Sequence, residues 1–176
     1  VLSAYCQRRG IAFVASSPFA IDGHVVSSTT IRRLLAGGDV EGAAKLLGRN
    51  PSVGGRVVKG DRRGRRLGFP TANLEREVHH ALPADGIYVA YTEVQGRRLR
   101  SAVNVGVRPT FDASRRTVES YVLDFDGDLY GQTIAIEFLH RLRPEQKFDS
   151  VEALREQMAR DVEQTREYFS GAAARS

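Results

Sequence analysis

Residues 117–125 read TVESYVLDF, and the strict alternation of their side-chain types indicates an extended, half-buried β-strand. Successive side chains of a strand point to opposite faces, so one face is predicted to carry Thr117, Glu119, Tyr121, Leu123 and Phe125. A carboxylate on such an apolar face lies either at the rim of a sheet or at a functional site. Both the fold class and the chemistry of the chain therefore depend on what surrounds this strand.

Short segments of the same kind occur on both sides of it, separated by Gly, Pro and Asp residues that are typical of turns. They are RVVKG (56–60), GIYVAYTEV (86–94), LRSAVNVGV (99–107) and TIAIEFLHRL (133–142). Short strands at even spacing favour an antiparallel sandwich or a small barrel over alternating strand–helix units. The chain is therefore predicted to be mainly β from about residue 53 onward.

A long helix is predicted after the last of these strands. Asp149 with Glu152 has the pattern of a capping box, and Gly171 is predicted to end the helix. Residues 172–176 are expected to form a disordered tail. One apolar stripe of the helix is predicted to consist of Val151, Leu154, Met158, Val162 and Phe169.

Residues 1–50 have a different pattern, with helices and one short strand. A first helix is predicted to end at Gly10 and to be followed by IAFVA (11–15) as a buried strand. Because the chain starts at Val1 inside this helical pattern, we expect it to be a piece of a longer protein.

Two more helices are predicted within 25–48, the first capped by Ser28 or Thr29 and the second by Asp39. Asn50-Pro51 then breaks the chain and is expected to be a domain boundary. The two helices either pack on the following domain or expose their leucines to solvent.

Composition narrows the function only slightly. The net charge is +5 from 26 Lys and Arg against 21 Asp and Glu, which favours an anionic partner without choosing among nucleotides, nucleic acids and acidic lipids. The single cysteine, Cys6, excludes an internal disulfide and fits a reducing, cytoplasmic location. The sequence contains no apolar run of the roughly 20 residues that a membrane-spanning helix needs.

The stretch GDRRGRRLGFPTAN (60–73) has the composition of an anion-binding loop. Its glycines permit close approach of backbone N–H groups to a phosphate, and its arginines add positive charge. The alternative is a solvated surface loop, and the stretch lacks the Gly-Lys-Ser/Thr ending of a P-loop.

Thr71 and Asn73 are two residues apart, so on an extended segment their side chains face the same way. A hydroxyl and an amide oxygen suit Mg²⁺ when substrate phosphates supply most of the negative charge. The alternative is a turn in which both side chains bond to the local backbone. For Glu119, the two alternatives are a base that accepts a proton from an alcohol and a cross-strand salt bridge to an arginine.

In combination and in this order, five segments resemble the riboflavin kinase module of bacterial bifunctional FAD synthetases. They are GRVVKGDRRGRRLGFPTANL, LPADGIYVAY, AVNVGVRPTF, VESYVLDFDGDLYG and RLRPEQKFDSVEALREQMARD. The resemblance covers about residues 53–168, and PTAN is its most specific element. VSSTTIRRLLAGGDVEGAAKLLGR resembles the end of the FMN adenylyltransferase module that precedes the kinase in those enzymes.

The resemblance implies a six-stranded antiparallel Greek-key barrel with a C-terminal helix, at residues 53–171, after an adenylyltransferase remnant at 1–50. It implies Mg²⁺-dependent transfer of a phosphoryl group from ATP to riboflavin, with FMN and ADP as products. No tightly bound redox cofactor, nucleic acid or membrane is expected, and the full-length protein would contribute the missing adenylyltransferase module.

The site residues implied by the resemblance fall into three groups. Glu119 would be the catalytic base, and Thr71 and Asn73 would bind Mg²⁺ and phosphates. The other ATP-binding residues would be Gly60, Arg65, Val122 and Tyr130. The loop RPEQKF would place Arg143, Gln146 and Phe148 at the flavin.

Two other functions match parts of the sequence. Synthesis of FAD from FMN is not expected, because the chain lacks the His-x-Gly-His type of phosphate site and keeps only about 50 residues of that module. A small basic barrel that binds nucleic acid is the alternative from another class. Against it, Phe69 is the only aromatic residue in the basic loop on which a base would stack.

Overall fold

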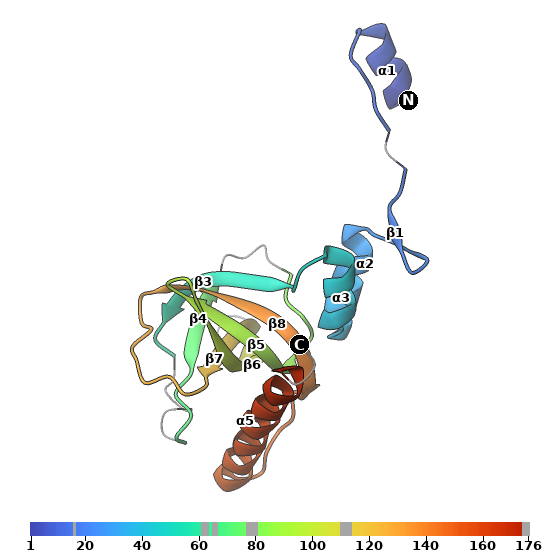
Figure 1. Ribbon diagram of the computed structural model, residues 1–176. Coiled ribbons are helices and arrows are strands. Elements are labelled where there is room, and N and C mark those ends of the chain that lie inside the picture. Colours follow the sequence, from blue (N-terminus) through green and yellow to red (C-terminus); the bar gives the residue numbers. More distant parts are fainter. Residues whose placement is uncertain (16, 61–63, 65–66, 77–80, 110–113, 174–176) are drawn as a thin grey trace.

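The computed structural model describes residues 1–176 except 16, 61–63, 65–66, 77–80, 110–113 and 174–176. Its centre is a closed barrel of six antiparallel strands, in the order β3-β4-β7-β6-β5-β8 (Figure 1). The strands are β3 (Ser52–Val58), β4 (Ala72–Arg76), β5 (Gly86–Val94), β6 (Arg97–Pro109), β7 (Ser114–Val122) and β8 (Thr133–Pro144). The prediction of an antiparallel barrel is confirmed.

The interior of the barrel is filled by side chains that alternate along each strand. On β6 and β7, Val103, Val105 and Val118 are completely buried, which leaves the residues between them on the outer face. Tyr88 and Phe138 meet edge to face inside, with ring centroids 5.4 Å apart. The barrel is therefore a packed core, and any ligand site lies at its ends or on its outer face.

The strand that contains Glu119 is shorter than predicted. It ends at Val122, because the chain turns at Asp124, which has a positive φ of 54°. Leu123 and Phe125 therefore lie beyond the alternation and do not share the face of Glu119. The outer face of this strand consists of Thr117, Glu119 and Tyr121, which are all half-buried, and it lacks the two apolar residues that were predicted to share it.

The sixth strand, β4, is absent from the segments proposed from the sequence. It begins at Ala72, inside the PTAN motif, and pairs with β3 and β7. Its sequence ANLER contains none of the β-branched and aromatic residues that mark strands. Its pairing partners on both sides, rather than its own composition, hold it extended.

The first helix, α1 (Leu2–Arg8), ends before Gly10 as predicted. The predicted buried strand at 11–15 is wrong: these residues are exposed and have no regular structure. No described strand lies beside them, and an isolated strand leaves its backbone N–H and C=O groups unpaired. A two-stranded ribbon follows, made of β1 (Ala20–Ile21) and β2 (His24–Val25).

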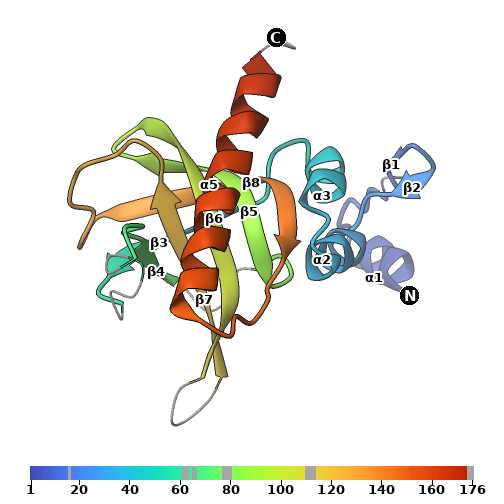
Figure 2. The same cartoon turned by 90° about the horizontal axis from the view of Figure 1, so that it is seen from below.

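Two helices, α2 (Ser28–Gly37) and α3 (Val40–Leu47), pack on the barrel beside β8 (Figures 1 and 2). The cap of α2 is Ser27 rather than Ser28 or Thr29, since its hydroxyl accepts the N–H of Thr30 at 3.1 Å. Asp39 caps α3 as predicted, through Gly42 N–H at 2.7 Å.

These two helices share the hydrophobic core of the barrel. Leu35, Val40 and Ala43 belong to the same buried cluster as the barrel valines, so their apolar faces are not left in solvent. The Arg141 side chain donates to the Gly37 carbonyl at 3.3 Å and strengthens the junction.

The C-terminal helix, α5 (Val151–Ala173), lies along the outside of the barrel across β5 and β6 (Figure 2). Its first turn is capped by Ser150, whose hydroxyl accepts the N–H of Ala153 at 3.1 Å, so the capping box at Asp149 is wrong. The helix also continues past Gly171, which means that the predicted tail begins too early.

The apolar stripe of α5 is confirmed except at its first residue. Phe169 is buried and packs on Tyr91, with ring centroids 5.0 Å apart. Val151 is 60% exposed and lies outside the stripe. Among the described residues, no helix has both the length and the apolarity to cross a membrane.

Candidate active site

A row of directly paired residues crosses the outer face of the barrel. Strand register pairs Asn73 with Glu119, Glu119 with Asn104, Asn104 with Ile87, and Ile87 with Arg143. Directly paired residues of neighbouring strands project to the same face of a sheet. The barrel therefore places two residues predicted from the sequence, Asn73 and Glu119, side by side, and a third, Arg143, three strands away.

Glu119 is bound by the threonine of the PTAN motif. The Thr71 hydroxyl donates to Glu119 Oε2 at 3.1 Å. Among the described residues, the Thr71 side chain has no hydrogen bond to the local backbone, which the turn alternative required. Within the described residues Glu119 has no ion pair with an arginine, which leaves its carboxylate facing the pocket described below.

Gly60 packs directly on the side chain of Asn73. A Cβ at Gly60 would lie 2.5 Å from Asn73 Oδ1, so any other residue at this position would force the Asn73 side chain to move. Gly64 packs most tightly on the backbone carbonyl of Phe69, and its hypothetical Cβ would be in ordinary contact with Thr71 Oγ1, at 3.4 Å. The loop that contains both glycines thus contacts the PTAN motif, while Arg65 lies outside the described residues.

A pocket of about 620 Å³ opens beside this motif. Its lining includes five of the residues predicted to bind ATP, namely Gly60, Thr71, Asn73, Val122 and Tyr130. Ala72 and Ser120, a directly paired couple on the inner face of β4 and β7, form part of its wall. We call it the first pocket.

The loop between β7 and β8 forms the far wall of the first pocket. Asp128 Oδ1 accepts the N–H of Tyr130 at 2.9 Å, which closes a tight turn within this loop. Asp124 accepts two hydrogen bonds from Arg166 on α5, and these hold the pKa of that carboxyl below its ordinary value. The loop is therefore tied to the C-terminal helix.

A second pocket, of about 410 Å³, lies on the outer face of the same strands. It contains the whole row described above, together with residues of the RPEQKF loop and of α5. Glu119 lines this pocket, and so do the three residues predicted to bind flavin, which are Arg143, Gln146 and Phe148. The two pockets share Thr71 and Asn73, so they meet where Thr71 bonds to Glu119.

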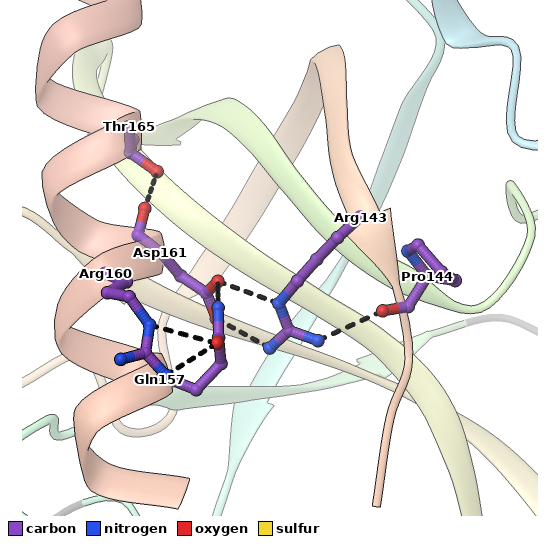
Figure 3. A network of polar contacts seen from close by, with 6 residues as sticks. All are labelled: Arg143, Pro144, Gln157, Arg160, Asp161 and Thr165. Carbon is purple, nitrogen blue, oxygen red and sulfur yellow. Dashed lines mark hydrogen bonds and ion pairs between the residues drawn. The ribbon is translucent and has the colours of Figure 1, made fainter. Parts of the chain in front are cut away.

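The wall of the second pocket is held by a buried ion pair that the sequence reasoning missed. Arg143 donates from Nε and Nη2 to the two carboxylate oxygens of Asp161, at 2.8 and 2.7 Å (Figure 3). Asp161 is only 4% exposed and also accepts from Gln157 at 2.9 Å. The missed signal was an acidic residue, Asp161, between Met158 and Val162 on the apolar side of α5.

Glu145 also lines the second pocket. Burial, followed by the charge of Asp85, raises the pKa of its carboxyl above the ordinary value, although a backbone hydrogen bond from Val107 and the charge of Arg143 act in the opposite direction. Gly106 lies against this side chain, since a Cβ there would be 2.5 Å from Glu145 Oε1.

The riboflavin kinase family model, described as Flavokinase, matches residues 47–169. The chain belongs to the riboflavin kinase family. The matched range contains the barrel, both pockets and most of α5. A nucleic-acid-binding barrel is not favoured by this match, and the family expected from the sequence motifs is confirmed.

Bifunctional riboflavin kinase/FMN adenylyltransferases are similar to this riboflavin kinase family member. The Haemophilus influenzae protein is 36% identical over 173 residues, which are 97% of this chain and 55% of that protein. The Bacillus subtilis protein is 39% identical over 148 residues, 82% of this chain and 47% of that protein. The chain therefore spans about half the length of these relatives.

Two solved structures share the fold. A riboflavin kinase from Trypanosoma brucei superposes with a TM-score of 0.50 at 28% identity, covering 68% of this chain and 79% of its own. A Streptococcus pneumoniae protein described as a macrolide-efflux protein superposes with a TM-score of 0.79 at 41% identity. That superposition covers 85% of this chain and 49% of the other. The description as an efflux protein applies to the Streptococcus pneumoniae protein.

Proposed function

We propose that this chain transfers the γ-phosphoryl group of ATP to the 5′-hydroxyl of riboflavin, with FMN and ADP as products. The observation that supports this most is the meeting of two pockets at Thr71 and Glu119. A transfer between two substrates needs each of them held on its own side of one reacting point. In this proposal ATP occupies the first pocket and riboflavin the second.

In the first pocket, Gly60, Val122 and Tyr130 contact the nucleotide, and Arg65 contributes from the same glycine-rich loop. Thr71 and Asn73 fit a magnesium ion that arrives with ATP, because their neutral oxygens suit an ion whose charge is balanced by phosphates. The close packing of Gly60 on Asn73 supports this role, since it brings loop backbone beside the amide. When bound, Mg²⁺ neutralises charge on the transferring group.

Glu119 acts at the second substrate. Its carboxylate accepts the proton of the 5′-hydroxyl while the hydroxyl oxygen forms a bond to the γ-phosphorus, and the bond between that phosphorus and ADP breaks. The hydrogen bond from Thr71 fixes the orientation of Glu119 before substrate arrives. Arg143, Gln146 and Phe148 contact the flavin, and Asp161 holds the Arg143 guanidinium in place.

The relatives are named as bifunctional, so the main alternative for this chain is a second activity, adenylyl transfer to FMN. We propose that the chain lacks it, and that residues 1–50 are the end of such a module and 53–171 the kinase domain. A cytoplasmic location is part of the same proposal.

The direct test is an assay of purified chain with riboflavin and ATP, with and without Mg²⁺, in which FMN and FAD are separated by chromatography. Magnesium-dependent formation of FMN without FAD is expected. Folded protein that forms no FMN would contradict the proposed kinase activity. Formation of FAD from FMN and ATP would contradict the assignment of residues 1–50 as an inactive remnant.

A further inference from the structure

Asn104 occupies the position next to Glu119 in the row across the barrel. It lies on β6, directly paired with Glu119 on one side and with Ile87 on the other. Its strand neighbours Val103 and Val105 are completely buried in the core, so the Asn104 side chain projects to the opposite face, into the second pocket. A polar amide here is not required by the packing of the barrel.

The amide oxygen of Asn104 is buried and has no hydrogen-bond partner within the described part of the chain. An acceptor in this condition costs free energy unless a ligand or a water molecule satisfies it. Asn104 also lines a smaller recess of about 60 Å³ beside Phe69 and Tyr121, which adjoins the second pocket. Asn104 therefore lines both parts of one ligand space.

Strand spacing determines which part of a flavin would reach Asn104. Neighbouring strands are about 4.8 Å apart, so Asn104 is one step from Glu119, and Arg143 is three steps away, about 14 Å when followed along the curved surface of the barrel. The ribityl chain has five carbons and extends over about 5 Å with bonds of about 1.5 Å. With the terminal hydroxyl at Glu119, the other ribityl hydroxyls lie near Asn104 and the ring system lies toward Arg143.

We propose that Asn104 is a positioning residue that hydrogen-bonds a hydroxyl of the ribityl chain and so aligns the terminal hydroxyl with Glu119. The inference rests on the proposed function and extends it to substrate specificity. An amide both accepts and donates hydrogen bonds, as a hydroxyl does, so the pairing holds in either orientation of the amide. Asn104 thus distinguishes a flavin that carries a polyol from one that does not.

The test compares riboflavin with lumiflavin, which has the same ring system and a methyl group in place of the ribityl chain. Binding of each is measured by quenching of flavin fluorescence, with ADP and Mg²⁺ present, for the unaltered chain and Asn104→Ala. Loss of one neutral hydrogen bond is expected to weaken riboflavin about 3- to 10-fold. Lumiflavin affinity is expected to change less than about 2-fold, because its ring does not reach Asn104.

Asn104→Ser is the matched variant, since its hydroxyl can also accept and donate, and it is expected to recover part of the lost riboflavin affinity. In turnover, Asn104→Ala is expected to raise the riboflavin KM and lower kcat, with the ATP KM unchanged. A merely structural role would weaken both flavins and ATP together. These kinetics also serve as the second measurement where lumiflavin binds too weakly for comparison.

Equal losses for the two flavins, or no loss for riboflavin, would overturn the role of Asn104 while leaving the kinase activity in place. Absence of riboflavin binding and of FMN formation in the unaltered chain would instead overturn the proposed function, and the role of Asn104 with it.

Discussion

The two pockets lie against the same pair of strands but are built in different ways. The first is formed by glycine-containing loops around the start of β4, with residues that are close in sequence to PTAN or to the turn after β7. The second is formed where β8 and α5 meet, and it is held by the buried pair Arg143–Asp161. A pocket made by local motifs is readable from sequence, whereas one made by long-range contacts depends on the assembled fold.

Glu119→Gln is expected to have the largest effect, because Glu119 stands where the two pockets meet. Removal of a general base lowers kcat about 10²- to 10⁴-fold, while the amide keeps an oxygen that can accept from Thr71. Affinities for riboflavin and ATP should change little. The measurement is steady-state kinetics, with Glu75→Gln, an exposed residue of β4, as control. A near-normal kcat would remove Glu119 from the mechanism.

Asp161→Ala is expected to damage the second pocket and the stability of the fold. It leaves the Arg143 guanidinium, only 17% exposed, without its carboxylate, and breaking a buried pair costs about 3–5 kcal/mol, with the lower end favoured here because water still reaches Arg143. Urea unfolding measures the change in the free energy of unfolding.

The control is Asp124→Ala, which removes a similar bidentate pair with Arg166 at the surface of the same helix. Its effect on stability should be much smaller, since water screens this pair. Equal losses in the two variants would mean that burial of the Arg143–Asp161 pair does not distinguish them.

Thr71→Ala and Asn73→Ala are expected to act mainly on the first pocket. Loss of a contact to a charged ligand weakens binding about 10- to 100-fold, so the ATP KM should rise and the Mg²⁺ requirement should increase. Riboflavin affinity should fall less than ATP affinity, because the two residues lie at the edge that the second pocket shares with the first. Thr71→Ser, which keeps the hydroxyl, is the matched control, and an unchanged magnesium dependence in the alanine variants would refute the ligand assignment.

The smallest expected effect is a pH dependence from Glu145 in the second pocket. Because its folded pKa is raised above the ordinary 4.5, its contribution to stability is full below about pH 4.5 and is lost as pH rises through the folded pKa. In Glu145→Gln this loss of stability with rising pH should be absent. The melting temperatures of the unaltered chain and of the variant, measured from pH 4 to 7, should differ at high pH and approach each other at low pH. Melting temperatures that differ by the same amount at every pH would contradict the prediction.

Alternation and even turn spacing are local properties, and they predicted an antiparallel sandwich or a small barrel; the resemblance of the ordered segments narrowed this to the six-stranded barrel. The residue types drew attention to Thr71, Asn73 and Glu119, but each had a structural alternative, and the resemblance supplied their roles. Asp161 and Asn104 were missed, because an acid on a helix and an amide on a strand acquire meaning only through Arg143 and Glu119, which reach them across the fold. The strand predicted at 11–15 failed because apolar composition alone does not provide a pairing partner.

The central claim is that the two substrates occupy separate pockets that meet at Thr71 and Glu119. Backbone amide chemical shifts, recorded during titration with ADP and Mg²⁺ and separately with riboflavin, test it most directly. ADP is predicted to shift residues at 71–73 and 120–130, and riboflavin those around Asn104, Gln146 and Phe148, with overlap near Thr71 and Asn73. Riboflavin shifts centred on 125–130, or ADP shifts centred on 145–158, would contradict the account.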